Sequence, residues 1–241
     1  MGNPDSDCAA EIERLRRALG AEMEEFVSIA AHNLREPLRD VASFSQLLAE
    51  TYAGRLDSDA GEFLERIREG AARMQSLLTD IVDYWAIGDG GLPSSGADME
   101  AVLSLALLST EIRIRERNAI VTHDSLPPVP GQFEILTKVL HHLIRNAIEY
   151  CEAPSPSIHI SSKRVALEWV FSVQDNGPGI APEFQSRIFG PFKRLHGREH
   201  PGNGMGLPFC KRAIEWQGGR MWMESAPGTG STFYFTLPAA E

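Results

Sequence analysis

Two long amphipathic patterns joined by a short turn constrain this sequence more than any other feature. Over residues 9–53, apolar side chains recur at steps of three and four, which places them in one stripe along a helix. The stripe consists of Ile12, Leu15, Leu19, Met23, Phe26, Ile29 or Ala30, Leu34, Leu38, Val41, Phe44 or Ser45, and Leu48. A second helix is predicted from Asp57 or Ser58, either of which suits an N-cap, to Trp85. The two patterns predict a helical hairpin.

The predicted hairpin carries more apolar surface than it can bury by itself. Because one hairpin leaves a broad stripe uncovered, pairing of two copies into a dimeric four-helix bundle is the economical solution, and we expect a homodimer. Pro37 lies inside the first pattern and removes one backbone hydrogen bond, so a kink is expected near residues 33–35.

A run rich in glycine, proline and serine over residues 88–96 predicts a linker. After it, helical stretches at about 99–117, 131–150 and 206–218 alternate with strand-like runs at 119–123, 157–161, 167–174, 219–224 and 231–237. This mixture of helices and antiparallel-looking strands favours an α+β sandwich over residues 97–241.

The formal net charge of −10 argues against a general nucleic-acid or anionic-membrane binder, which needs a basic surface. The acidity is uneven: residues 1–87 hold nine arginines, no lysine and 17 acidic residues, whereas residues 181–212 hold six cations and two acids. Three scattered cysteines provide no disulfide framework, and no apolar run approaches the roughly 18–20 residues that cross a bilayer. We therefore expect a cytoplasmic chain with no membrane span and no nucleic-acid partner.

Three features of the second half carry chemistry. The first is the string DNGPGI at residues 175–180, which follows an apolar strand. Its Asp can accept a hydrogen bond from an exocyclic amine, and its glycines let the backbone pass close to a ligand. The string alone also fits a turn. Residues 202–207 form a glycine-rich run that opens an apolar helix, which fits a phosphate site or a surface loop. Asn146, on the helix at 131–150, has an amide oxygen suited to Mg²⁺, although a lone Asn is usually polar surface.

Together these features resemble the ATP-binding domain shared by sensor histidine kinases, DNA gyrase, heat-shock protein 90 and mismatch-repair proteins. The runs at residues 188–196 (IFGPFKRLH) and 218–233 are similar to the phenylalanine box and the closing glycine box of the histidine-kinase branch. Residues 31–38 (AHNLREPL) resemble its phospho-acceptor box, and the Glu-Pro-Leu-Arg continuation is similar to the phytochrome-like subgroup. The resemblance spans about residues 24–238.

The resemblance implies a role for each matching residue. His32 would be the phospho-acceptor, Asn146 would hold Mg²⁺, and residues 181–203 would form a lid over bound ATP. The nucleotide-binding residues it implies are Asn146, Tyr150, Asp175, Gly177, Gly179, Ile180, Phe189, Lys193, Arg194, Gly204, Gly206, Leu207 and Thr232.

Two departures from the family's pattern concern the catalytic residues. The residue after the acceptor histidine is usually Glu or Asp, whereas here it is Asn33, which accepts a hydrogen bond but takes no proton at neutral pH. Glu36 lies on the same helical face as His32 and is the candidate substitute. His142 stands where the family usually has an earlier Asn, and it is a candidate metal-side ligand or base, or a divergent surface residue.

The resemblance implies a two-component histidine kinase core that transfers the ATP γ-phosphoryl to His32 and then to an Asp of a response regulator. The alternatives are a catalytically weak ATP-binding signalling scaffold, favoured by Asn33, and a histidine phosphotransfer protein. The expected organisation is a signalling coiled-coil segment at 1–23, a dimerisation and phospho-acceptor domain at 24–87, a linker at 88–96 and a catalytic domain at 97–241. A sensor domain is expected upstream or on another chain.

Overall fold

The structure is a computed structural model of the 241-residue chain. It describes residues 4–88, 96–194 and 202–239, with only the backbone described for residues 4–19 and 21. The chain divides into two compact units, Met1–Asp89 and Gly90–Glu241. Most of the predicted linker lies outside the described residues.

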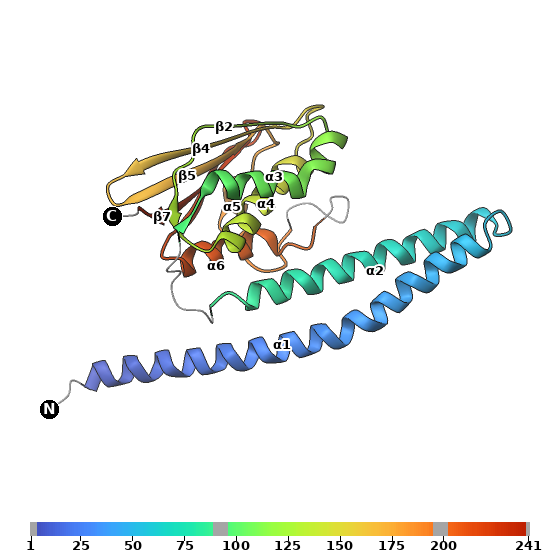
Figure 1. The fold of residues 1–241 in the computed structure, drawn as a ribbon, viewed down its shortest axis with the longest axis horizontal. Helices are drawn as coiled ribbons and strands as arrows, with labels where there is room; N and C mark the ends of the chain where they lie inside the picture. Colours follow the sequence, from blue (N-terminus) through green and yellow to red (C-terminus); the bar gives the residue numbers. More distant parts are fainter. Residues whose placement is uncertain (1–3, 89–95, 195–201, 240–241) are drawn as a thin grey trace. The chain divides into compact units, whose positions relative to one another are not determined.

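The first unit is the predicted helical hairpin, made of α1 (Pro4–Thr51) and α2 (Ser58–Trp85). Asp57 caps α2, because its side chain accepts a hydrogen bond of 2.8 Å from the Ala60 backbone N–H. Helix α1 continues through Pro37 and changes direction partway along its length (Figure 1), as expected where proline removes a backbone bond. The backbone of residues 4–23 is helical, and the predicted coiled-coil packing of this segment stays a prediction.

Few side chains of the hairpin are buried within one chain. Ala31, Ser45 and Ala71 are buried where α1 and α2 face each other. Large apolar side chains of the predicted stripes stay exposed, among them Phe26 at 67% and Phe44 at 65%. An uncovered apolar surface of this size indicates a further packing partner.

The second unit is a two-layer α/β sandwich. A five-stranded sheet runs in the order β2 (Ile120–His123), β4 (Ser157–Val165), β5 (Glu168–Asp175), β7 (Ser231–Pro238) and β6 (Met221–Ser225). Helices α3 (Met99–Glu116), α4 (Phe133–Glu149) and α6 (Gly206–Trp216) cover one face of this sheet (Figure 1). The short β1 (Gly96–Ala97), β3 (Val129–Pro130) and α5 (Pro182–Gln185) were not predicted, because segments of two to four residues carry no periodicity.

The expectation of antiparallel strands is wrong at one edge of the sheet. Strand β2 pairs with β4 in parallel, with Ile120 opposite Ser157, whereas the other pairs are antiparallel. The physical reason is the connection: the chain passes through α4 between these strands, and such a crossover returns the second strand in the same direction.

The core of this unit lies between the sheet and the helices. Alternate residues of the central strands are buried, and the rings of Phe171 and Phe235 stack with centroids 5.0 Å apart. Leu136, Leu140 and Leu143 of α4 supply the facing layer. This packing brings the end of β5, the end of α4 and the start of α6 to one edge of the sandwich.

Candidate functional site

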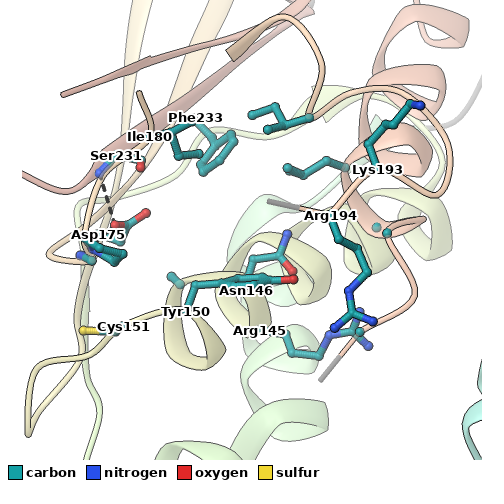
Figure 2. A pocket seen from close by; sticks show the side chains of 18 of the residues that line it. Arg145, Asn146, Tyr150, Cys151, Asp175, Ile180, Lys193, Arg194, Ser231 and Phe233 are labelled. Atoms are coloured by element: carbon teal, nitrogen blue, oxygen red, sulfur yellow. Dashed lines mark hydrogen bonds between the residues drawn. The ribbon is translucent and has the colours of Figure 1, made fainter. Parts of the chain in front are cut away.

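An open cavity lies at this edge of the second unit (Figure 2), within a space of about 870 Å³ that includes open solvent. Its walls come from the end of α4, the segment after β5, the segment before α6, the first turn of α6 and the start of β7. The predicted nucleotide-binding residues that line it are Asn146, Tyr150, Asp175, Gly177, Gly179, Ile180, Lys193, Arg194, Gly204, Gly206 and Leu207.

Asp175 ends β5 with its carboxylate on the cavity wall (Figure 2). Its Oδ1 accepts hydrogen bonds from the backbone N–H of Gly177 at 2.8 Å and of Ser231 at 3.1 Å. Burial raises the pKa of Asp175, and these two N–H groups partly oppose that shift. Since Oδ1 is held by the backbone, Oδ2 is the atom available to accept a bond from a ligand.

Glycine is required at two positions of the wall. Gly179 has φ +74°, and a Cβ there would lie 2.0 Å from the Ala226 carbonyl oxygen. Gly204 has φ +71°, and its own carbonyl accepts a hydrogen bond of 3.0 Å from Phe192 N–H. The second contact ties the segment before α6 to the segment that carries Lys193 and Arg194.

The last turn of α4 presents two predicted ligands on one face. Asn146 and Tyr150 are four residues apart and both line the cavity. Burial and nearby Glu149 raise the pKa of the Tyr150 hydroxyl, while Arg194 and Arg145 oppose that shift. The charges of Arg194 and Arg145 therefore both act on the Tyr150 hydroxyl.

The opposite end of the cavity is suited to phosphate. Lys193 and Arg194 line it together with Gly206 and Leu207, which open the eleven-residue helix α6. Within the described part of the chain no side chain caps α6 at Met205, so the first backbone N–H groups of the helix are available to an anion.

Three of the site residues predicted in the second unit do not line the cavity. The ring of Phe189 lies under Lys211, whose Nζ is 5.6 Å from the ring centroid. Thr232 points to the other face of the sheet, the face on which Tyr234 stacks with Trp222 at 5.2 Å. Because side chains alternate along a strand, Ser231 and Phe233 lie in the wall instead. This alternation along β7 is the sequence signal that could have identified them.

His142 is the third residue outside the cavity wall. The alternative that it is a divergent surface residue is wrong, because it is buried. Its ring is buried against Phe209 of α6 with centroids 5.2 Å apart. Burial, with Arg145 as the next cause, lowers the pKa of His142 to about 3, so the imidazole is neutral. Among the described residues, no three His, Cys, Asp or Glu side chains gather to hold a metal ion, and His142 gains no support as a ligand.

Other lining residues were not among the predicted nucleotide-binding residues, although several of them lie within the motif strings. Arg145 precedes Asn146, and Cys151 follows Tyr150, with its Sγ 3.3 Å from Asn176 Oδ1. The remaining ones are Ala147, Pro178, Ile188, Gly202, Asn203 and Pro208. Adjacency to the predicted residues was the one available signal for most of them.

The hairpin carries the other predicted catalytic residues. His32, Asn33 and Glu36 are all exposed on α1. His32 and Glu36 are four residues apart and so lie on one face of the helix, while Asn33 points elsewhere. Among the described residues, no helix is long and apolar enough to cross a membrane.

Two family models match this chain. Residues 22–90 match the His Kinase A (phospho-acceptor) domain, and residues 131–241 match the histidine kinase-, DNA gyrase B-, and HSP90-like ATPase. Cyanobacterial phytochrome A of Nostoc sp. is 44% identical over 90% of this chain and 29% of its own length. The chain spans between 29% and 31% of the first three curated relatives that it matches.

Solved structures agree with this assignment. Full-length ShkA in complex with AMPPNP is similar over 90% of this chain and 46% of that chain, with a TM-score of 0.71 and 25% identity. Histidine kinase ThkA in complex with response regulator protein TrrA shares the fold over 96% of this chain and 66% of that chain, with a TM-score of 0.63 and 22% identity. The chain therefore belongs to the histidine kinases, with a His Kinase A phospho-acceptor domain followed by an ATPase domain.

Proposed function

We propose that this chain is the kinase core of a two-component system, in which ATP bound in the cavity phosphorylates His32. One observation carries the proposal: the cavity joins a backbone-held carboxylate, Asp175, to a cationic wall at the start of α6. That pairing suits a ligand with an amine at one end and phosphates at the other.

The cavity residues have separate roles in binding ATP. Asp175 Oδ2 accepts a hydrogen bond from the exocyclic amine of adenine, and Tyr150, Ile180 and Phe233 supply apolar surface for the base. Lys193, Arg194 and the first N–H groups of α6 bind the phosphates.

Mg²⁺ fits the donor set near the phosphate end. Asn146 would hold it through the side-chain oxygen, and the nucleotide's own phosphates would supply further oxygens, which suits a site where no carboxylate cluster is described. When bound, the ion neutralises phosphate charge.

The acceptor step takes place at His32. A neutral imidazole nitrogen attacks the γ-phosphorus, a P–N bond forms, and the P–O bond to ADP breaks with its electron pair on the β-phosphate oxygen. The imidazole N–H proton then passes to a base. Glu36 lies on the same helical face as His32 and can accept this proton. The Asn33 amide can accept a hydrogen bond but takes no proton.

The assembly and the partners follow from the same proposal. The exposed apolar side chains of α1 and α2 support a homodimer, and the complex of ThkA with a response regulator supports transfer from His32 to an Asp of such a partner. We propose a cytoplasmic location, where ATP is available, and a sensor domain upstream or on another chain.

Labelling with γ-³²P-ATP tests the proposal. The wild-type chain is expected to acquire acid-labile, alkali-stable label, His32→Ala to acquire none, and chelation of Mg²⁺ to prevent labelling. His123→Ala, an exposed histidine of the second unit, is the matched control and is expected to label normally. Equal labelling of wild type and His32→Ala would exclude His32 as the acceptor.

Asn33 supports a second candidate, a catalytically weak scaffold that binds ATP and signals by conformation. Replacing the general base at this position with an amide costs about 10²–10⁴ in rate if no other group serves. Asn33→Asp in the same labelling assay separates the two candidates: a large gain in rate supports the scaffold, and an unchanged rate supports Glu36 as the base. The cavity lined by Asn146 and the glycine segments speaks against a phosphotransfer protein without nucleotide.

A further inference from the structure

Arg145 is a cavity-lining cation that none of the motifs assigns. It lies near the C-terminal end of α4, directly before Asn146, and its side chain is 23% exposed. Figure 2 shows Arg145 and Arg194 reaching from two different elements toward the same end of the cavity.

The hydrogen bonding of Arg145 is incomplete. Its Nε is a buried side-chain nitrogen without a hydrogen-bond partner in the part of the chain that the structure describes. The carboxylate of Glu149 lies 3.8 Å from Nε, which is an ion-pair distance but too long for a hydrogen bond. A partly buried guanidinium with an unpaired N–H lacks an acceptor, and an anionic oxygen is the strongest one.

A neutral histidine holds the other side of the guanidinium. Arg145 Nη2 lies 3.4 Å from His142 Nδ1, and because a guanidinium has only donors, Nδ1 is the acceptor. The same His142 ring packs against the start of α6, since a Cβ on Gly206 would lie 3.1 Å from Nδ1. His142 therefore ties Arg145 to the helix N-terminus that is suited to phosphate.

Two arginines meet at this end of the cavity, whereas the side chain of Lys193, which also lines the cavity, extends away from them (Figure 2). Lys193 and Arg194 come from the segment before α6, and Arg145 comes from α4. Figure 2 shows the side chains of Arg145 and Arg194 converging there, and both charges oppose the raised pKa of the Tyr150 hydroxyl. Like charges gathered in a partly buried site favour an anion that neutralises them.

We propose that Arg145 binds the phosphates of the nucleotide through its guanidinium, with His142 as the residue that positions it. This inference rests on the proposed function, because it adds a residue to the same ATP cavity. It assigns to the buried His142 a role in orienting a cation in place of a role as a metal ligand.

Binding of ATP and of adenosine to the full chain, measured by calorimetry, tests the assignment. Arg145→Gln is expected to weaken ATP binding by about 10- to 100-fold, the effect of removing a hydrogen-bonded charge, and to leave adenosine binding within about twofold. Arg145→Lys is expected to restore part of the ATP affinity. Arg115→Gln, an exposed α3 arginine paired with Glu111, is the matched control and is expected to bind both ligands as wild type does.

Glu149→Gln separates phosphate binding from a structural ion pair. If Arg145 served only to pair with Glu149, this variant would weaken ATP binding as Arg145→Gln does, and the assignment would be overturned. We expect ATP affinity to be kept or raised, because the variant removes a competing carboxylate.

Two other outcomes are decisive. Equal loss of ATP and adenosine affinity in Arg145→Gln, or in Arg145→Lys where the first variant unfolds, would overturn the phosphate assignment. A wild-type chain that binds neither ligand would instead refute the proposed function itself.

Discussion

At the scale of single residues, Asp175 has the most demanding environment in the cavity. Its carboxylate is partly buried at the end of β5, and two backbone N–H groups hold one of its oxygens. Burial raises the pKa of Asp175 because it disfavours the charged form, and the two donors compensate only in part. The residue therefore costs stability as a carboxylate, which is the pattern of a side chain retained for binding.

Adenosine affinity should depend on the protonation of Asp175. As pH falls through the raised pKa, the carboxylate gains a proton and becomes a weaker acceptor for the adenine amine, so affinity falls earlier than an exposed Asp would predict. Adenosine is the suitable probe because it carries the adenine amine but has no phosphate groups that titrate in the same pH range. Calorimetric titration from neutral pH downward measures the effect, and an Asp175→Asn variant with the same pH profile would contradict it.

The same variant has an expected effect on stability. A raised folded-state pKa means that the protonated carboxyl contributes stability below the unfolded pKa, and that this stability is lost as pH rises through the folded pKa. Asp175→Asn keeps an oxygen for the two N–H donors and removes the buried charge. We expect an equal or higher melting temperature at neutral pH together with a loss of adenosine affinity of at least about tenfold.

At the scale of elements, the turn after β5 depends on one glycine. Gly179 has a left-handed φ of +74°, and a Cβ at this position would lie 2.0 Å from the backbone carbonyl oxygen of Ala226. Gly228 has a similar φ of +80°, but a Cβ there would meet nothing within 4 Å. A substitution at Gly228 therefore introduces backbone strain alone, whereas one at Gly179 introduces backbone strain and a steric overlap.

Gly179→Ala should be much more destabilising than Gly228→Ala. Both add the strain of a left-handed alanine, about 1 kcal/mol, and only Gly179→Ala adds an overlap that forces the backbone of residues 226–227 to move, for a total of about 3 kcal/mol or more. Urea unfolding followed by tryptophan fluorescence compares them, since Trp169, Trp216 and Trp222 all lie in the second unit. Equal losses in the two variants would show that the overlap is relieved at no cost.

At the scale of the whole molecule, the hairpin exposes apolar side chains that the ATP cavity does not use. Phe44 of α1 is 65% exposed within one chain, and Phe63 of α2 is 62% exposed. The cavity, in contrast, is lined, among the described residues, by residues between 145 and 233 of the second unit. Dimerisation and nucleotide binding are therefore expected to be separable by substitution.

Phe44→Asp should convert a dimer into a monomer and leave adenosine binding unchanged, because a charge in an apolar interface is costly and the cavity is remote in sequence. Sedimentation equilibrium measures the first effect and calorimetry the second. Leu167→Asp, at a side chain that is 80% exposed in the second unit, is the control and is expected to remain a dimer. A wild-type monomer, or a dimer that persists in Phe44→Asp, would contradict the predicted bundle.

The sequence by itself determined the features that neighbouring residues carry. The steps of three and four predicted α1 and α2, and Asp57 or Ser58 was the predicted N-cap of the second helix, where the structure has Asp57. The resemblance of the motif strings to the histidine-kinase family, and not any one string alone, placed Asn146, Asp175 and the glycine segments in one nucleotide site, and the structure brings all of them to one cavity. These signals are local, since helix periodicity and turn chemistry depend on residues a few positions apart.

Only the tertiary structure decided which side chains face the cavity and which are buried behind it. It replaced Thr232 with Ser231 and Phe233, buried His142 behind the wall, added Arg145 and made the β2–β4 pair parallel. Each outcome depends on contacts between distant parts of the chain, such as the bond from Ser231 to Asp175 across 56 positions. Strand pairing and register set the face of every side chain in a sheet, and no local pattern contains that information.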